Sequence, residues 1–238
     1  MKGELHLFSR EGRSCACLVP EGSGPFPLLL LCGWEMEKTL PRLGESLPPV
    51  ALLFVEAQGD RDFTPWPAPG IREGELFSGG GKAYLDFLLE EILPYGQREF
   101  SLSSDPCQRG ILGYSLGGLF ALWAQSQGTS FQVAGSLSGS LWYPGWMEYL
   151  FTHPPRREEK IYLSLGDREE RGGPPALRRV GDCTRLAHGF YEAQGIETIL
   201  EWNRGGHGKG VENRWKKALA WAAPRVVRPG IWEGSGKA

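Results

Sequence analysis

The segment with the clearest chemical meaning is Gly113-Tyr114-Ser115-Leu116-Gly117, in which a serine stands between two glycines. A short apolar run at residues 109–112 precedes it, and an apolar segment of helical spacing follows at once. A strand that turns directly into a helix holds the serine hydroxyl above the sheet, and the glycines let neighbouring elements approach. The pattern therefore predicts a serine nucleophile at Ser115. The alternative is that Ser115 only caps the helix.

A serine hydroxyl needs a base that accepts its proton, and histidine is the residue most often used. His207 lies in the loop Arg204-Gly205-Gly206-His207-Gly208, directly after the last predicted strand and after the serine in chain order. Sites with this serine turn have that order of residues. The other three histidines lie in a predicted strand (His6), before two prolines (His153) and inside a predicted helix (His188). We therefore predict His207 as the base.

A carboxylate should orient the histidine and stabilise its charged form. The expected place is the end of a strand between Ser115 and His207, and residues 161–165 form that strand. It ends in Gly166-Asp167-Arg168-Glu169-Glu170, which offers three carboxylates in one turn. A side chain in the middle of this loop reaches further towards the histidine, which favours Glu169. Asp167 and Glu170 remain alternatives, and a role as surface charge is open for each.

Two main-chain N–H groups are candidates for stabilising a developing oxyanion. The first belongs to Leu116, at the N-terminus of the helix that follows the serine. The second is expected in the loop after the first parallel strand, residues 28–32, where Gly33 and Trp34 follow. Gly33 allows the backbone to turn inward, so the Trp34 N–H is the second candidate. The Trp34 ring could wall the acyl pocket or serve packing alone.

The elements that must position these residues alternate along the chain. Short apolar runs predict strands at residues 5–8, 14–19, 28–32, 51–55, 109–112, 133–137, 161–165 and 197–202. Amphipathic segments predict helices at 81–100, 116–127, 142–151, 176–194 and 211–222, with a kink or break at Pro94. This order predicts an α/β fold with a mostly parallel sheet and helices on both faces. The first two strands, joined near Gly12, should form an antiparallel hairpin at one edge.

Composition limits the classes of protein. The 238 residues are 41% hydrophobic and 23% charged, with a net charge of −2. We expect one domain over residues 1–238, with edge strands in residues 1–27 and a flexible tail at 229–238. No basic run indicates a nucleic-acid partner, and apolar runs such as residues 28–32 are too short to span a membrane. Five cysteines without a CxxC pattern and a start unlike a signal peptide predict a soluble cytoplasmic protein.

These segments resemble the putative-esterase family of α/β hydrolases, the group that contains esterase D and the enterochelin-esterase-like (IroE-like) hydrolases. The resemblance extends over residues 28–221. It is carried by these segments in order: Arg61-Asp62-Phe63-Thr64-Pro65-Trp66-Pro67, Gly79-Gly80-Gly81, Leu85-Asp86-Phe87-Leu88, Leu93-Pro94-Tyr95, the serine segment continued to Leu122, Ser138-Gly139-Ser140-Leu141-Trp142-Tyr143, Ser164 to Glu170, and Leu200-Glu201-Trp202-Asn203 ahead of Gly206-His207. It implies the α/β-hydrolase fold with Ser115 as nucleophile, His207 as base, Glu169 as acid and Gly33-Trp34 at the oxyanion strand end.

The expected function is hydrolysis of a small-molecule carboxylic ester through an acyl-enzyme, without a cofactor or a metal. Candidate substrate contacts are Arg61, Tyr114 and Trp142. One alternative, taken from relatives that hydrolyse siderophore trilactones, is a Ser–His dyad with a cationic cleft formed by Arg61, Arg72, Arg168 and Arg171. Acyl transfer or thioester hydrolysis uses the same groups. The third alternative is a binding module that keeps the fold without catalysis.

Overall fold

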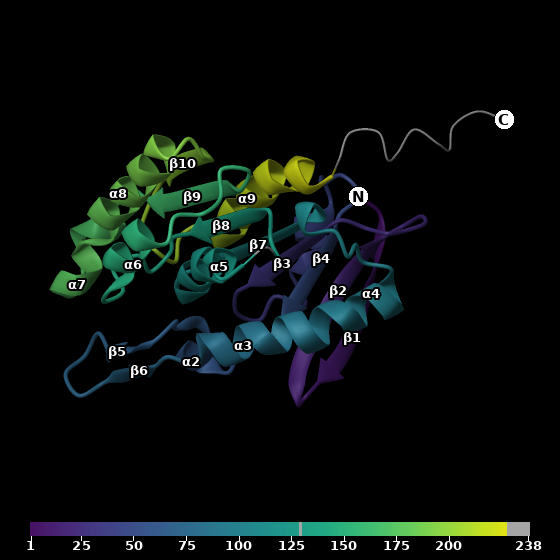
Figure 1. Cartoon of the computed structure of the whole chain (residues 1–238), viewed down its shortest axis with the longest axis horizontal. Coiled ribbons are helices and arrows are strands. Elements are labelled where there is room, and N and C mark those ends of the chain that lie inside the picture. Colours follow the sequence, from purple (N-terminus) through teal and green to yellow (C-terminus); the bar gives the residue numbers. More distant parts are fainter. Residues whose placement is uncertain (129, 228–238) are drawn as a thin grey trace.

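The eight strands predicted from short apolar runs all form, and they join in one sheet. The chain is described here from a computed structural model, which defines residues 1–128 and 130–227. The strands are β1 (Gly3–Arg10), β2 (Arg13–Pro20), β3 (Leu28–Cys32), β4 (Ala51–Val55), β7 (Arg109–Tyr114), β8 (Val133–Leu137), β9 (Lys160–Gly166) and β10 (Glu197–Asn203). Their order across the sheet is β1-β2-β4-β3-β7-β8-β9-β10, so β1 and β10 are its edges (Figure 1).

The predicted hairpin at the edge is confirmed. Strands β1 and β2 are antiparallel and are joined by Glu11 and Gly12, whose φ angles are 47° and 74°. Strand β2 is antiparallel to β4, and every pair from β4 to β10 is parallel. The carboxyl ends of the parallel strands therefore meet at one edge, which is where sites in open α/β sheets lie.

The helix predicted over residues 81–100 forms as a continuous helical run whose hydrogen-bonding pattern changes in the middle. It consists of α3 (Gly81–Phe87), a π-helical turn (Leu88–Ile92) and α4 (Leu93–Phe100). Pro94 has no N–H to donate, and its ring would clash with the carbonyl four residues earlier in a regular α-helix. The wider turn directly before Pro94 avoids that clash, so the predicted kink or break takes the form of a π turn.

Two predicted helices have different limits in the structure. The segments at 142–151 and 176–194 become α6 (Trp146–Thr152), α7 (Pro175–Arg178) and α8 (Val180–Ala193). The first begins later than predicted because the residue before Pro144 disfavours helical backbone and Gly145 has a φ of 80°. The second is interrupted at Arg179, so it counts as two helices.

The remaining predicted helices agree closely with the sequence pattern. Helix α5 (Leu116–Ser126) ends one residue before the predicted limit of 127. Helix α9 (Val211–Val226) continues four residues beyond the predicted limit of 222 and contains Pro224 in its last turn. The flexible tail predicted at 229–238 lies outside the described residues.

Two short α-helices and two short strands were missed by the sequence reasoning. They are α1 (Leu40–Gly44), α2 (Gly59–Phe63), β5 (Pro67–Pro69) and β6 (Leu76–Ser78). None is long enough to show a helical or alternating period, and both strands of the β5–β6 hairpin adjoin Pro or Gly residues. The hairpin projects from the body of the molecule beside α2 (Figure 1).

Helices cover both faces of the sheet, as predicted. Side chains of α1 and α9 pack with one set of strand residues, and those of α2 to α6 and α8 pack with the other. Strand β3 shows the two faces directly. Leu28, Leu30 and Cys32 belong to one buried cluster, while Leu29 and Leu31 belong to the other. Such a strand is apolar throughout because both of its faces are buried.

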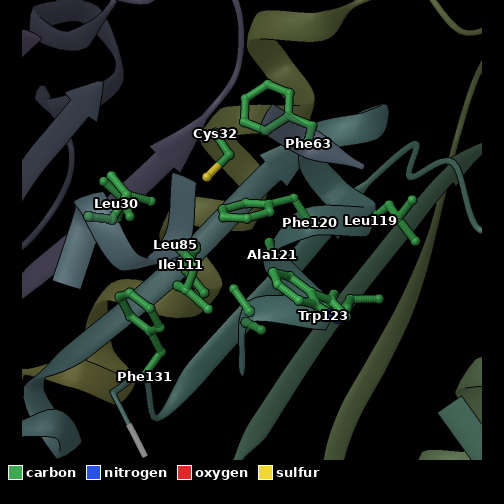
Figure 2. Packing of buried hydrophobic residues seen from close by; sticks show 14 of the residues in the cluster. Leu30, Cys32, Phe63, Leu85, Ile111, Leu119, Phe120, Ala121, Trp123 and Phe131 are labelled. Carbon is green, nitrogen blue, oxygen red and sulfur yellow. The ribbon is translucent and has the colours of Figure 1, made fainter. Parts of the chain in front are cut away.

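Helix α5 is almost entirely buried, which fixes the element that follows Ser115. Phe120 lies among Cys32 of β3, Ile111 of β7 and Phe63 of α2 (Figure 2). Since the helix packs on three neighbouring elements, its N-terminus has little freedom to shift against the sheet. Within residues 1–128 and 130–227, no helix has the length and apolar character needed to cross a bilayer.

Candidate active site

Ser115 occupies the sharp turn between β7 and α5. Its φ of 60° and ψ of −124° lie in a region that residues with a side chain rarely adopt. Main-chain hydrogen bonds hold this conformation: Ser115 N–H donates to Leu137 O at 3.0 Å, and Ser115 O accepts from Gly118 N–H and Ser140 N–H, each at 3.0 Å. The turn that the sequence pattern predicted is therefore present, anchored to β8 and to the loop that follows it.

The two glycines of the motif are required by close backbone contacts. A Cβ atom at Gly113 would lie 1.9 Å from Gly117 O, and one at Gly117 would lie 2.2 Å from Cys32 O. Either distance is far below a van der Waals contact. The missing side chains thus allow α5 to start directly over β7 and beside the end of β3.

His207 lies beside the Ser115 hydroxyl. The loop between β10 and α9 carries it, and its Nε2 is 3.1 Å from Ser115 Oγ. Its Nδ1 is 2.8 Å from Glu169 Oε2. The hydroxyl of Tyr114 donates to the main-chain oxygen of His207. The histidine side chain is 51% exposed, so an incoming substrate has access to it.

Glu169 begins a short 3₁₀ turn (Glu169–Arg171) after β9, and its side chain is 4% exposed. Its Oε1 accepts hydrogen bonds from Gly166 N–H at 2.7 Å, Ser138 Oγ at 2.9 Å and Arg214 Nη1 at 2.6 Å. Burial raises the pKa of this carboxyl, but hydrogen bonds from His207, Arg214 and Gly166 outweigh burial and leave the pKa below its ordinary value. Glu169 is therefore ionised wherever the histidine can act as a base.

The two alternative carboxylates face other partners. Asp167 Oδ1 accepts from Gly205 N–H at 2.8 Å, which ties the loop after β9 to the loop that carries His207. Glu170 forms an ion pair with Arg185 at 2.8 Å. Of the three candidates, only Glu169 has a hydrogen bond to the histidine among the described residues.

The candidate oxyanion donors lie at the start of α5 and just after the end of β3, two segments that approach closely because residue 117 is a glycine. Leu116 is the first residue of α5, where an N–H has no partner within the helix. The turn with Gly33 and Trp34 follows Cys32, whose carbonyl lies against Gly117. Trp34 N–H has no hydrogen-bond acceptor within residues 1–128 and 130–227. The Trp34 ring is 46% exposed and meets Phe63 edge-on with 5.3 Å between ring centroids.

A cavity of about 420 Å³ opens over the serine and the histidine. Four apolar side chains line it: Ile71, Trp142, Leu177 and Val180. Arg168, Ser138 and Ser140 contribute polar groups. Its size suits a small ester whose non-reacting part is largely apolar.

The three predicted substrate contacts have different positions. Trp142 lines the cavity. Arg61 is exposed beside Gly80 and is not among the lining residues, so its role stays a prediction. Tyr114 is buried in the cluster that includes Trp215 of α9, away from the cavity lining. Its hydroxyl supports the His207 main chain, which is a different task from contacting substrate.

The family model described as Putative esterase matches residues 32–225, a span that includes Ser115, Glu169 and His207. This span is most of the chain. The protein belongs to the putative esterase family. It is thus an ester hydrolase, as the sequence predicted, and its fold is the mixed α/β fold of such enzymes.

Individual proteins similar to this esterase share less than 30% of its sequence. The uncharacterized protein YbbA of Bacillus subtilis (strain 168) is 28% identical over 211 residues, covering 82% of this chain and 84% of the relative. Among solved structures, an IroE-like serine hydrolase from Shewanella oneidensis superposes with a TM-score of 0.74 at 16% identity, covering 93% of this chain and 80% of that one. The siderophore hydrolase EstA from Aspergillus nidulans gives 0.71 at 18% identity, covering 95% of each chain. At these identities the solved structures establish the shared fold.

Two residues that contact the candidate site were missed by the sequence reasoning. Ser138, which has a φ of 48°, donates to Glu169 and lines the cavity. Arg214 donates a hydrogen bond to Glu169. A signal for Arg214 was present, since it occupies the apolar stripe of α9 together with Trp215 and Ala218. A charged residue in such a stripe indicates a buried, paired group. Within residues 1–128 and 130–227, no group of three or more His, Cys, Asp or Glu side chains could hold a metal ion.

Proposed function

We propose that this esterase cleaves its substrate by attack of Ser115 Oγ on the ester carbonyl carbon. His207 Nε2 takes the serine proton as the new C–O bond forms, and the carbonyl oxygen becomes an oxyanion. Collapse of this intermediate breaks the bond to the alcohol, which leaves with the proton that His207 returns. Water then attacks the acyl-serine with His207 again as base, which releases the acid and restores the serine.

Glu169 is the third member of the proposed triad. Its Oε2 accepts the Nδ1 proton of His207, which fixes the tautomer with a free Nε2 and stabilises the imidazolium. The observation that carries the proposal is the unbroken series of contacts from Ser115 Oγ to His207 Nε2, at 3.1 Å, and from Nδ1 to Glu169 Oε2, at 2.8 Å. The N–H groups of Leu116 and Trp34 are the proposed oxyanion donors.

The proposed substrate is a small-molecule ester with an apolar acyl or alcohol part, in keeping with the apolar lining of the cavity. The second candidate is a siderophore lactone cleaved by a Ser–His dyad, which the name of the Aspergillus nidulans neighbour suggests. Four arginines were considered for a cationic cleft, and of these Arg168 lines the cavity. A dyad would leave Glu169 without a catalytic effect, so variants of Glu169 separate the two.

Two wider expectations are also part of the proposal. One eight-stranded sheet runs from Gly3 to Asn203, which supports a single hydrolase domain. The five cysteines are unpaired, which agrees with a reducing compartment such as the cytoplasm. The binding-module alternative is set aside because the chain is an ester hydrolase.

The kinetic test uses Ser115→Ala with p-nitrophenyl acetate and a set of apolar esters. Loss of the nucleophile should lower kcat by at least about 10³-fold while the thermal midpoint changes little. Ser46→Ala, on an exposed turn, is the matched control and should keep normal turnover. Near-normal turnover by a pure Ser115→Ala preparation would mean that another group performs the chemistry.

A further inference from the structure

A buried arginine contacts the acid of the proposed triad. Arg214 belongs to the first turn of α9, and only 1% of its side chain is exposed. Charged side chains are seldom so fully buried unless they have partners, because burial removes their hydration. The partners of Arg214 therefore identify what the arginine does.

The partners of Arg214 belong to both loops that carry the proposed acid and base. Its Nη1 donates to Glu169 Oε1 at 2.6 Å and also to the hydroxyls of Ser138 and Tyr114. Its Nη2 donates to the main-chain oxygen of Gly206, the residue before His207, at 2.8 Å. One planar guanidinium thus holds the Glu169 carboxylate with one nitrogen and the histidine loop with the other.

We propose that Arg214 is a positioning residue for ester hydrolysis, which fixes Glu169 through Oε1 so that Oε2 faces His207 and which holds the histidine loop through Gly206 O. The inference rests on the proposed function, since it presupposes that Glu169 and His207 act together. Arg214 does not line the cavity, so its effect on substrate is indirect.

The packing leaves this arrangement little freedom. A Cβ atom at Gly166 would lie 2.7 Å from Arg214 Nη2, 2.7 Å from Glu169 Oε1 and 2.3 Å from Gly205 O. The end of β9 must therefore be glycine for the arginine and the carboxylate to meet. The same Gly166 donates its N–H to Glu169 Oε1, which completes the set of donors around that oxygen.

The arginine also sets the charge around the histidine. Arg214 and Glu169 together are neutral, and the cluster acquires one positive charge when His207 accepts the serine proton. Arg168 lines the cavity together with Glu169 and His207. The neighbouring acids, Asp167 and Glu170, are bound to Gly205 N–H and Arg185.

Loss of the Arg214 charge should therefore make the Glu169–His207 pair hold its inactivating proton up to a higher pH. The shift is towards higher pH whether the proton resides on the histidine or on the carboxyl group, because the positive charge of Arg214 repels a proton in both positions.

The test compares Arg214→Met and Arg214→Lys with Arg225→Met as the matched control. Arg225 is on the same helix and forms an ion pair with Glu197 at 2.7 Å; its side chain is partly exposed and does not line the cavity. With p-nitrophenyl acetate, Arg214→Met should lower kcat by roughly 10- to 100-fold with little change in KM. The acidic limb of its kcat/KM profile should move to higher pH by roughly 1 unit. Arg225→Met should leave both unchanged.

Arg214→Lys keeps the charge but cannot reach both partners in the same planar geometry. It should lower kcat less than the methionine variant and leave the acidic limb in place. Because Lys leaves no unpaired buried carboxylate, this variant also provides the test if Arg214→Met does not fold.

A double-mutant cycle with Glu169→Gln decides whether Arg214 acts through the acid. We expect Arg214→Met to slow the Glu169→Gln protein less than it slows the unchanged protein, since only the contact with Gly206 O is then left to lose. The inference is overturned if the two losses multiply, or if the Arg214 variants keep both normal kcat and the normal pH profile. If Glu169→Gln is inactive while the Arg214 variants keep normal kcat and pH profiles, this inference is rejected and the proposed triad still stands.

Discussion

Gly117 lies against Cys32 so closely that a methyl group on Gly117 would come within 2.2 Å of the Cys32 carbonyl oxygen. The contact joins the first turn of α5 to the end of β3. These two segments carry the proposed oxyanion donors, so their separation sets the geometry that the oxyanion would meet.

The first prediction follows from this contact. Gly117→Ala should push the start of α5 away from β3, because the obstructing atom belongs to the main chain and cannot rotate aside. We expect a loss of roughly 1–3 kcal/mol in the free energy of unfolding, as for other overpacked sites. Turnover of p-nitrophenyl acetate should fall by at least about tenfold, since one misplaced oxyanion donor costs that much or more.

The control for Gly117→Ala is the same substitution in another helix. Gly189 lies within α8, and no atom lies within 4 Å of a Cβ placed there. Gly189→Ala should stabilise the protein by up to about 1 kcal/mol, because alanine is the better helix former, and should leave turnover unchanged. If urea unfolding gave the same change in the free energy of unfolding for Gly117→Ala and Gly189→Ala, Gly117 would not be in close contact with Cys32.

The second prediction ranks the three carboxylates after β9. Glu169→Gln keeps the shape of the side chain but removes its charge, so kcat should fall by roughly 10²- to 10⁴-fold with little change in KM. Asp167→Asn keeps an oxygen for Gly205 N–H, and Glu170→Gln loses only an ion pair at the surface. Both should cost less than about tenfold. Mild effects of all three, with Ser115 and His207 still essential, would favour the dyad and the siderophore candidate.

Much of this site could be predicted from the sequence because its determinants are local. Ser115 stands in a strand–turn–helix segment, and His207 follows the last strand in a glycine-rich loop. Glu169 was favoured over its neighbours by its place in the middle of the loop and by the family resemblance, and the structure gives it the contact with His207. The sequence offered no comparable clue to the contact between the Tyr114 hydroxyl and the main chain of His207, since the two residues are 93 positions apart.

What could not be predicted depends on contacts between distant segments. Arg214 meets Glu169 across 45 residues of chain, and only the packing of α9 against the sheet brings them together. The cavity lining has the same origin, since Ile71 comes from the loop between two strands too short to be recognised. The π turn before Pro94 was missed because a proline in a helical pattern indicates a kink without showing how the backbone accommodates it.

The third prediction concerns stability against pH. Glu159 is 5% exposed, and burial raises the pKa of its carboxyl to about 7. The folded protein then holds a proton that the unfolded chain releases above its ordinary pKa of about 4.5. The favourable contribution is complete below that ordinary value and is lost as the pH rises towards 7.

Glu159→Gln should remove this dependence. Its free energy of unfolding should exceed that of the unchanged protein at pH 8 by on the order of 1–3 kcal/mol, with a much smaller difference at pH 4.5. Urea unfolding at the two pH values measures the difference. The adjacent, exposed Glu158→Gln is the control and should show no such change. A Glu159→Gln protein with the same pH dependence as the unchanged one contradicts the assignment.

The central claim is that Ser115 is the nucleophile activated by His207, and covalent labelling tests it most directly. A fluorophosphonate reacts with a serine that a base has activated, forming a phosphonyl ester and releasing fluoride. Digestion and mass spectrometry should therefore find one adduct per chain, on the peptide that contains Ser115. Ser115→Ala should give no adduct, and His207→Ala should be labelled more slowly by at least about 10³-fold. An adduct at another serine, or equal labelling of Ser115→Ala, would contradict the account.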